Sequence, residues 1–265
     1  MGKPLLIDVT AANADSLPCC GIRDPKHPGR AAKLRWLKRN FKLGLKAKVL
    51  AEPDGRPCGY IEYIPGEQAW RGVEAAGYLF IHCVWNHSRS GRGQGWATAM
   101  LDACLQDASR AGMNGVAVVT RDGPWMADRR LFLANGFTQV DEARPDYQLL
   151  VRKLKARAPN PRFHGGFEAR PAKYRKGLTI VECGQCPYIA KFAGEIAGAA
   201  EESYGVKARR VELRSSRDAQ NAPSPLAVFS VILDGRLLAD HQISRTRFHN
   251  IMRGTPSRPA AKSAK

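Results

Sequence analysis

The clearest sign of a ligand-binding site in this sequence is a set of three alternating glycines, Gly91, Gly93 and Gly95. They follow a strand-like run, GYLFIHCVWN (77–86), and lead into a helix-like run of small and apolar residues. A strand that passes through glycines into a helix presents backbone N–H groups at the positive end of the helix dipole. Glycine also lets ligand oxygens approach the main chain closely. The pattern predicts an anion site that suits a pyrophosphate.

Two common nucleotide-binding motifs do not fit this glycine stretch. A P-loop needs Lys followed by Ser or Thr, whereas Trp96-Ala97 follow Gly95 here. A Rossmann motif needs an early βαβ unit, whereas these glycines come after a helix and an antiparallel-looking hairpin. A glycine turn with only a structural role is the remaining alternative.

The second group of residues that could do chemistry is Cys183-Gly184-Gln185-Cys186, between a predicted strand and a helix that opens at Pro187. A thiol at a helix N-terminus has a lowered pKa, and C-x-x-C there is typical of thioredoxin-like dithiols. Three interpretations stay open: a redox-active pair, a half-site for a soft metal or thiophilic ligand, and a pair in a domain used for recognition. No second C-x-x-C exists, so we expect no metal site.

The elements that must position these residues form two α/β units. In the first unit, 1–155, we expect strands at 4–9, 46–52, 57–64, 77–86, 114–121, 138–143 and 147–155, and helices at 30–43, 94–111 and 126–137. A basic linker or partly ordered loop rich in Pro and Gly follows at 156–176. In the second unit, 177–252, we expect strand 177–182, helix 187–204, strand 207–214, a hairpin over 226–243 and helix 245–252, before a disordered tail, 253–265.

Composition limits the partners and the location of the protein. The chain has 265 residues, a formal net charge of +18 and a pI near 10.0. Such a charge attracts polyanions, so nucleic acid stays open as an alternative partner, although no known RNA module is present. No apolar run is long enough for a membrane span, and the N-terminus does not read as a signal peptide. We expect a cytoplasmic protein with mostly reduced cysteines, and the oligomeric state is not predicted.

Two motifs of the first unit, Arg92-Gly93-Gln94-Gly95-Trp96-Ala97 and FLANGF (132–137), match the motifs of a known family. The first fits the Arg/Gln-x-x-Gly-x-Gly/Ala signature of the GNAT family of N-acetyltransferases, and the second resembles that family's Tyr-x-x-x-Gly-Phe segment. The resemblance covers about residues 1–155 and implies a mixed, mostly antiparallel sheet with flanking helices. It implies that acetyl-CoA is the cofactor, with its pyrophosphate on the N–H groups of residues 92–97. The pantetheine would then pair with the strand end at Cys83, Val84 and Trp85.

The whole layout looks more narrowly like the YoaP-like acetyltransferases. The shared features are an early cysteine pair, here Cys19-Cys20, and a C-terminal thioredoxin-like domain. Cys19 and Cys20 would be two reduced thiols near the first helix, or one would face the substrate. Pro223-Ser224-Pro225 resembles the cis-Pro loop of the thioredoxin fold, with Pro225 as the cis residue.

The resemblance implies acetyl transfer by direct attack of an amine on the thioester, with a backbone N–H polarising the carbonyl. A small-molecule amine is the expected acceptor, and a protein acceptor stays open. Two alternatives remain: a thiol redox or thiophilic-ligand sensing protein that uses Cys183/Cys186 with a CoA-binding first domain, and an RNA-associated acetyltransferase.

The acid and base of this reaction are open. Phe132 stands where many family members have the tyrosine that reprotonates the CoA thiolate, so Tyr78, Cys83 or a water would have to replace it. Glu62 and His82 are the candidate general bases. Strand alternation predicts that His82 and Val84 point to one face of the sheet and Cys83 and Trp85 to the other.

Overall fold

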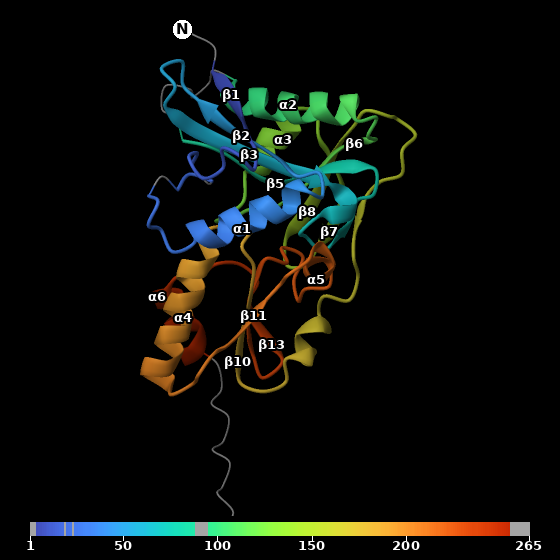
Figure 1. Cartoon of the computed structure of the whole chain (residues 1–265). Helices are drawn as coiled ribbons and strands as arrows, with labels where there is room; N and C mark the ends of the chain where they lie inside the picture. Colours follow the sequence, from blue (N-terminus) through green and yellow to red (C-terminus); the bar gives the residue numbers. More distant parts are fainter. Residues whose placement is uncertain (1–3, 19, 23, 88–94, 255–265) are drawn as a thin grey trace, which may run out of the picture.

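A seven-stranded sheet forms the framework of the first half of the chain (Figure 1). The computed structural model describes residues 4–18, 20–22, 24–87 and 95–254. The strand order is β1-β2-β3-β5-β6-β8-β7, and every neighbouring pair is antiparallel except β5 and β6. The strands are β1 (Leu5–Val9), β2 (Lys46–Ala51), β3 (Pro57–Pro65), β5 (Tyr78–Asn86), β6 (Gly115–Thr120), β7 (Thr138–Ala143) and β8 (Tyr147–Lys153). The mixed, mostly antiparallel sheet predicted from the sequence is confirmed.

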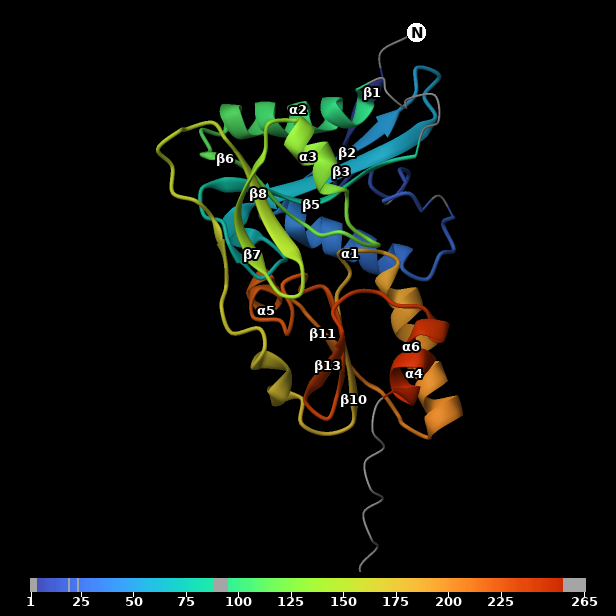
Figure 2. The ribbon, with the colours of Figure 1, turned by 180° about the vertical axis from the view of Figure 1, so that it is seen from behind.

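Helices cover both faces of this sheet, because its central strands alternate apolar residues between two cores. Leu79 and Ile81 face one core, which packs under α2 (Trp96–Arg110) and α3 (Arg129–Ala134). Phe80 faces the other core, which packs against α1 (Arg30–Phe41). Figures 1 and 2 show α1 on one side of the sheet and α2 with α3 on the other.

Strand β5 separates from β6 halfway along its length. It pairs with β6 only over Tyr78–Ile81, while its pairing with β3 continues to Asn86. From His82 to Asn86 the edge that faces β6 therefore has no partner strand in the described chain. Over Cys83–Trp85 this edge can therefore pair with an extended ligand.

A β-bulge in the same strand changes which side chains share a face. Glu62 on β3 pairs with Cys83 and Tyr63 pairs with Ile81, so His82 is an extra residue between them. The His82 ring lies against Trp36 and Phe80 in the α1-side core, where Cys83 also packs. The predicted alternation is therefore wrong at His82: it shares a face with Cys83, and Val84 lies in the opposite core.

A second, four-stranded sheet lies below α1 in Figure 1. Its order is β11-β10-β12-β13, with β10 and β11 parallel and the other pairs antiparallel. The elements are β10 (Leu178–Glu182), α4 (Ile189–Tyr204), β11 (Arg209–Glu212), the short α5 (Ser216–Gln220), β12 (Phe229–Leu233), β13 (Arg236–Ala239) and α6 (Arg245–Arg253). In the described chain the cis peptide bond is Arg144–Pro145, so the expectation of a cis bond at Pro225 is wrong.

Residues 156–176 connect the two sheets and pack against both. They contain β9 (Arg162–Phe163), which pairs with β4 (Val73–Glu74), and a 3-10 turn, η2 (Arg170–Lys173). Another 3-10 turn, η1 (Gly66–Gln68), precedes β4. The α1-side core continues without a break into the second sheet. No helix of the described residues is long and apolar enough to cross a membrane.

Candidate active site

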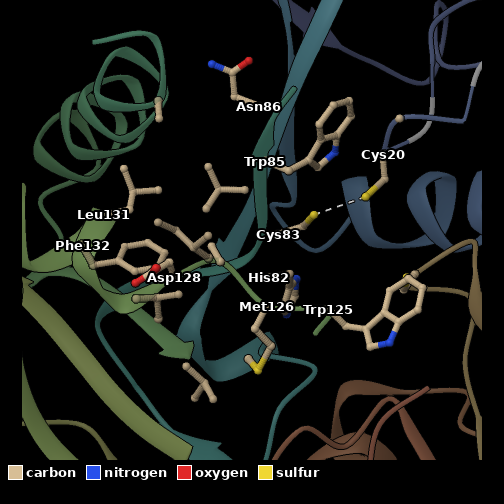
Figure 3. A pocket seen from close by; sticks show the side chains of 18 of the residues that line it. Cys20, His82, Cys83, Trp85, Asn86, Trp125, Met126, Asp128, Leu131 and Phe132 are labelled. Carbon is tan, nitrogen blue, oxygen red and sulfur yellow. Dashed lines mark hydrogen bonds between the residues drawn. The ribbon is translucent and has the colours of Figure 1, made fainter. Parts of the chain in front are cut away.

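A cavity of about 740 Å³ opens where β5 leaves β6 (Figure 3). One wall is the free half of β5, and another is made by α2, α3 and the segment before α3. The third wall comes from the Cys183–Cys186 loop of the second sheet. The residues that line the whole cavity include Cys20, Arg71, His82, Cys83, Val84, Trp85, Ala97, Trp125, Met126, Asp128, Phe132, Cys186 and Tyr188.

Most of the predicted cofactor residues that the structure describes are at this cavity. The residues Cys83, Val84, Trp85, Ala97 and Phe132 line it, whereas the side chain of Trp96, the first residue of α2, is buried in the apolar core. Gly95 is the N-cap of α2 with φ of 72°, a left-handed conformation that favours glycine. The first N–H groups of any helix have no acceptor within the helix, so this end can hold an anion. Arg92, Gly93 and Gln94 lie outside the described residues.

The two positions considered for the general acid differ in their placement. Phe132 is fully buried, packs edge-on against Phe137 at 5.5 Å, and has no proton to donate. Tyr78 lies at the start of β5, away from the cavity lining, and its hydroxyl donates to the Pro159 carbonyl at 2.8 Å. Burial raises the pKa of Tyr78. The structure therefore does not bring Tyr78 to the cavity.

His82 lines the cavity, but its accepting nitrogen is already used. Nε2 accepts a hydrogen bond from the Trp70 backbone N–H at 2.8 Å, which assigns the ring proton to Nδ1. Burial lowers the pKa of His82 well below its usual value, and Arg71 and Lys33 lower it further. The ring is therefore neutral. Its Nδ1 is buried and has no hydrogen-bond partner in the described chain.

Glu62 is fully buried and lies outside the cavity lining, in a cluster that joins the two sheets. One carboxylate oxygen accepts from Lys33 Nζ at 2.5 Å and from the Tyr60 hydroxyl at 2.6 Å. The other accepts from Gln185 Nε2 at 2.5 Å, and Lys33 also donates to the Gln185 carbonyl at 2.5 Å. Burial opposes the charge on Lys33, but Glu62, together with the nearby Cys20 and Cys83, outweighs it, so the pKa of Lys33 is raised. Glu62 thus ties α1 and β3 to the Cys183–Cys186 loop.

Cysteine thiols gather on the same wall. Cys20 and Cys83 direct their sulfurs at each other, 3.2 Å apart (Figure 3). Cys186 also lines the cavity. Burial raises the pKa of Cys183 and of Cys186 to about 12, so both are neutral thiols at neutral pH. In the described part of the chain, no group of three or more His, Cys, Asp and Glu side chains could hold a metal ion. Cys19 lies outside the described residues.

Arg71, Trp125 and Tyr188 are among the lining residues that the sequence analysis missed. They lie outside the helices and strands, and each reaches the cavity only through tertiary contacts. Trp125 packs on Tyr188 and Phe192 at ring distances of 5.8 and 4.9 Å, which closes the wall between the two sheets. The sequence signal that could have identified two of them is an aromatic residue before α3, Trp125, and one after the C-x-x-C motif, Tyr188.

The comparisons with known proteins agree with this geometry. Residues 13–137 match the model of the acetyltransferase (GNAT) family, and residues 208–250 match the YoaP-like model. The chain belongs to the GNAT family of acetyltransferases, with a YoaP-like C-terminal region. A relative from Bacillus subtilis strain 168, described as the uncharacterized N-acetyltransferase YoaP, is 30% identical over 250 residues. The match covers 93% of this chain and 97% of the relative.

Solved structures of the family show weaker likeness. A GNAT family N-acetyltransferase (YhbS) from Escherichia coli in complex with CoA is 16% identical, with a TM-score of 0.42. That alignment covers 61% of this chain and 89% of the other. A ribosomal-protein-alanine N-acetyltransferase from Brucella melitensis is 18% identical, with a TM-score of 0.41. The alignment covers 57% of this chain and 99% of the other chain. These scores are too low to add to the assignment.

The protein is therefore an acetyl-CoA-dependent N-acetyltransferase that acts on an amine acceptor. The residues present suit the cofactor, because the free edge of β5 and the glycine-capped start of α2 border one cavity. Neither alternative from the sequence, a thiol-based sensor or an RNA-associated enzyme, is favoured by the family assignment.

Proposed function

We propose that the acceptor is a small-molecule amine that enters the cavity between β5, α3 and the Cys183–Cys186 loop. The observation that carries this proposal is the wall supplied by the second sheet, where Cys186 and Tyr188 face the free half of β5. A site closed on this side suits a small molecule better than a folded protein or an extended peptide.

The two units divide the work in this proposal. Residues 1–155 hold acetyl-CoA and carry out the transfer, 156–176 connect, and 177–252 complete the acceptor site. The order β11-β10-β12-β13, with a strand–helix–strand crossover first and a hairpin and helix next, supports a thioredoxin-like assignment of the second unit. The expected tail, 253–265, begins one residue too early, because Arg253 is the last residue of α6; residues 255–265 lie outside the described chain.

Acetyl-CoA supplies the thioester, and the chain supplies its placement. The pyrophosphate would lie on backbone N–H groups of residues 92–97, and the pantetheine along the free edge of β5 near Cys83, Val84 and Trp85. Residues from both units would hold the amine next to the carbonyl carbon, which converts a bimolecular reaction into one within a complex.

We propose positioning roles for Glu62 and His82. The carboxylate of Glu62 already accepts three hydrogen bonds, and His82 has no free lone pair to accept a proton. The amine would therefore attack in its neutral form and lose its proton to water. With Phe132 unable to donate, water or the Cys83 thiol would protonate the departing thiolate.

Acetyl-CoA turnover against a panel of acceptors tests this proposal. We expect at least one small amine to accelerate CoA release, while peptides with free N-termini or lysines do not. The Cys186→Ala enzyme should show a higher KM for the amine, and Cys58→Ala, a buried change outside the cavity lining, should not. Acceleration by the peptides alone would contradict the proposal.

A further inference from the structure

Arg71 is a buried cation on the wall of the cavity. It lies between η1 and β4, lines the cavity, and is only 4% exposed. Its Nη1 donates to the Trp70 carbonyl at 2.7 Å and its Nη2 to the His82 carbonyl at 3.0 Å. Both nitrogens approach Gln185 Oε1 at 3.4 Å. All of these acceptors are neutral, and no carboxylate of the described residues forms an ion pair with Arg71.

The groups around Arg71 do not cancel its charge. Lys33 and Glu62 neutralise each other, and Gln185 links this pair to Arg71. Asp128 is the acid in the cavity lining, but its carboxylate is held by the backbone and guanidinium of Arg130. The cluster formed by Lys33, Glu62 and Arg71 therefore carries a net positive charge at the cavity wall.

The thiols of Cys186 and Cys20 do not supply the missing negative charge either. Burial raises the pKa of Cys186 to about 12, and Cys20 has a pKa well above its usual value because of its contact with Cys83 and its burial. A buried charge without a partner is strongly destabilising. A ligand that brings one negative charge to this wall would relieve that cost.

A second donor lies beside Arg71. Nδ1 of His82 is buried, carries the ring proton, and has no partner in the described chain, while the carbonyl of the same residue binds Arg71. Across the cavity the wall is largely apolar and aromatic, from Trp125, Met126 and Tyr188. One guanidinium and one N–H suit a carboxylate, which has one charge and two accepting oxygens, better than a doubly charged phosphate.

We propose that the acceptor carries a carboxylate beside its amine, as an amino acid does, and that Arg71 binds this carboxylate. The inference rests on the proposed small-molecule acceptor and names its chemical class. Arg71 then holds the acceptor by an end that does not react, so that the amine is presented to the thioester. The competing role, in which Arg71 stabilises the departing CoA thiolate, gives a different result in the experiment below.

The experiment compares amino acids with their carboxamides, which keep the amine and remove the charge. Rates are normalised to the neutral fraction of each amine. For the native enzyme we expect kcat/KM to be about 100-fold higher for the carboxylate, mainly through KM, as for a charge-assisted hydrogen bond. Arg71→Gln should remove this preference, so that the ratio of the kcat/KM values for the two acceptors falls to about one. Arg71→Lys should keep part of the preference for the carboxylate. The control Arg129→Gln, a half-buried residue outside the cavity lining, should keep all of it.

Two outcomes would overturn the inference. The first is no preference for the carboxylate by the native enzyme. The second is an equal fall in kcat for both acceptors in Arg71→Gln, which would assign Arg71 to the thiolate or to structure. Calorimetric binding of the amino acids to the native and Arg71→Gln proteins, checked for folding by thermal unfolding, reads the subsite without acetyl transfer. A failure of the proposed acetylation would therefore be seen separately.

Discussion

Lys33 shows how the site depends on single side chains that the sequence presents as ordinary. It belongs to a helix rich in Lys and Arg, yet it is fully buried against Glu62. Nothing in the local pattern distinguishes it, because one of its partners, Gln185, is 152 residues away. By contrast, the cavity positions of Cys83 and Phe132 followed from the motifs, since those motifs describe a local backbone path.

The assignment of Glu62 as a positioning residue predicts a loss of stability from Glu62→Gln. The change leaves Lys33 buried without an ion pair, so we expect a loss of about 3–5 kcal/mol in the free energy of unfolding. The double variant Lys33→Met/Glu62→Gln should recover part of it. Denaturant unfolding measures both. A different result would make Glu62 the general base instead. In that case Glu62→Gln would keep the stability of the native enzyme but lose kcat, and any increase of kcat with pH in the native enzyme would be absent in the variant.

At the level of elements, the free half of β5 decides what the cavity can hold. The sequence predicted this strand over 77–86 and the helix after it, because aromatic and β-branched residues precede the glycines. It did not predict the bulge at His82, which arises from the register of β3 and has no local signal. That one extra residue places Cys83 on the same side as Cys20, where their sulfurs meet.

The loop after β10 is a second element whose place is critical. Gly29, just before α1, lies so close to it that a Cβ there would be 1.6 Å from the Pro187 carbonyl oxygen. Gly29→Val should therefore push the loop away from α1 and open the acceptor wall. We expect the KM for the acceptor to rise at least about tenfold, which corresponds to about 1.4 kcal/mol. The affinity for CoA should change little.

Steady-state kinetics and calorimetry with CoA measure the two quantities separately. The control is Gly194→Ala, in α4, where an added Cβ meets no atom within 4 Å. Loss of CoA affinity in Gly29→Val would mean that the loop supports the cofactor site and not the acceptor site.

At the level of the whole molecule, the two sheets share one core and one cavity. The sequence separated them at 156–176, because this stretch has no periodicity and is rich in Pro, Gly and basic residues. The structure gives it a two-residue strand, and Phe167 and Tyr174 are buried. Such short pairing and single buried aromatics depend on distant partners, so no pattern within the segment could predict them.

The central claim is that the turn into α2 and the free edge of β5 hold acetyl-CoA with its thioester in the cavity beside Cys83. A crystal structure of the protein with acetyl-CoA tests it most directly. We predict density for the pyrophosphate at the backbone of residues 92–97 and for the pantetheine along His82–Asn86. Density for the cofactor elsewhere, with this cavity empty at saturating acetyl-CoA, would contradict the account.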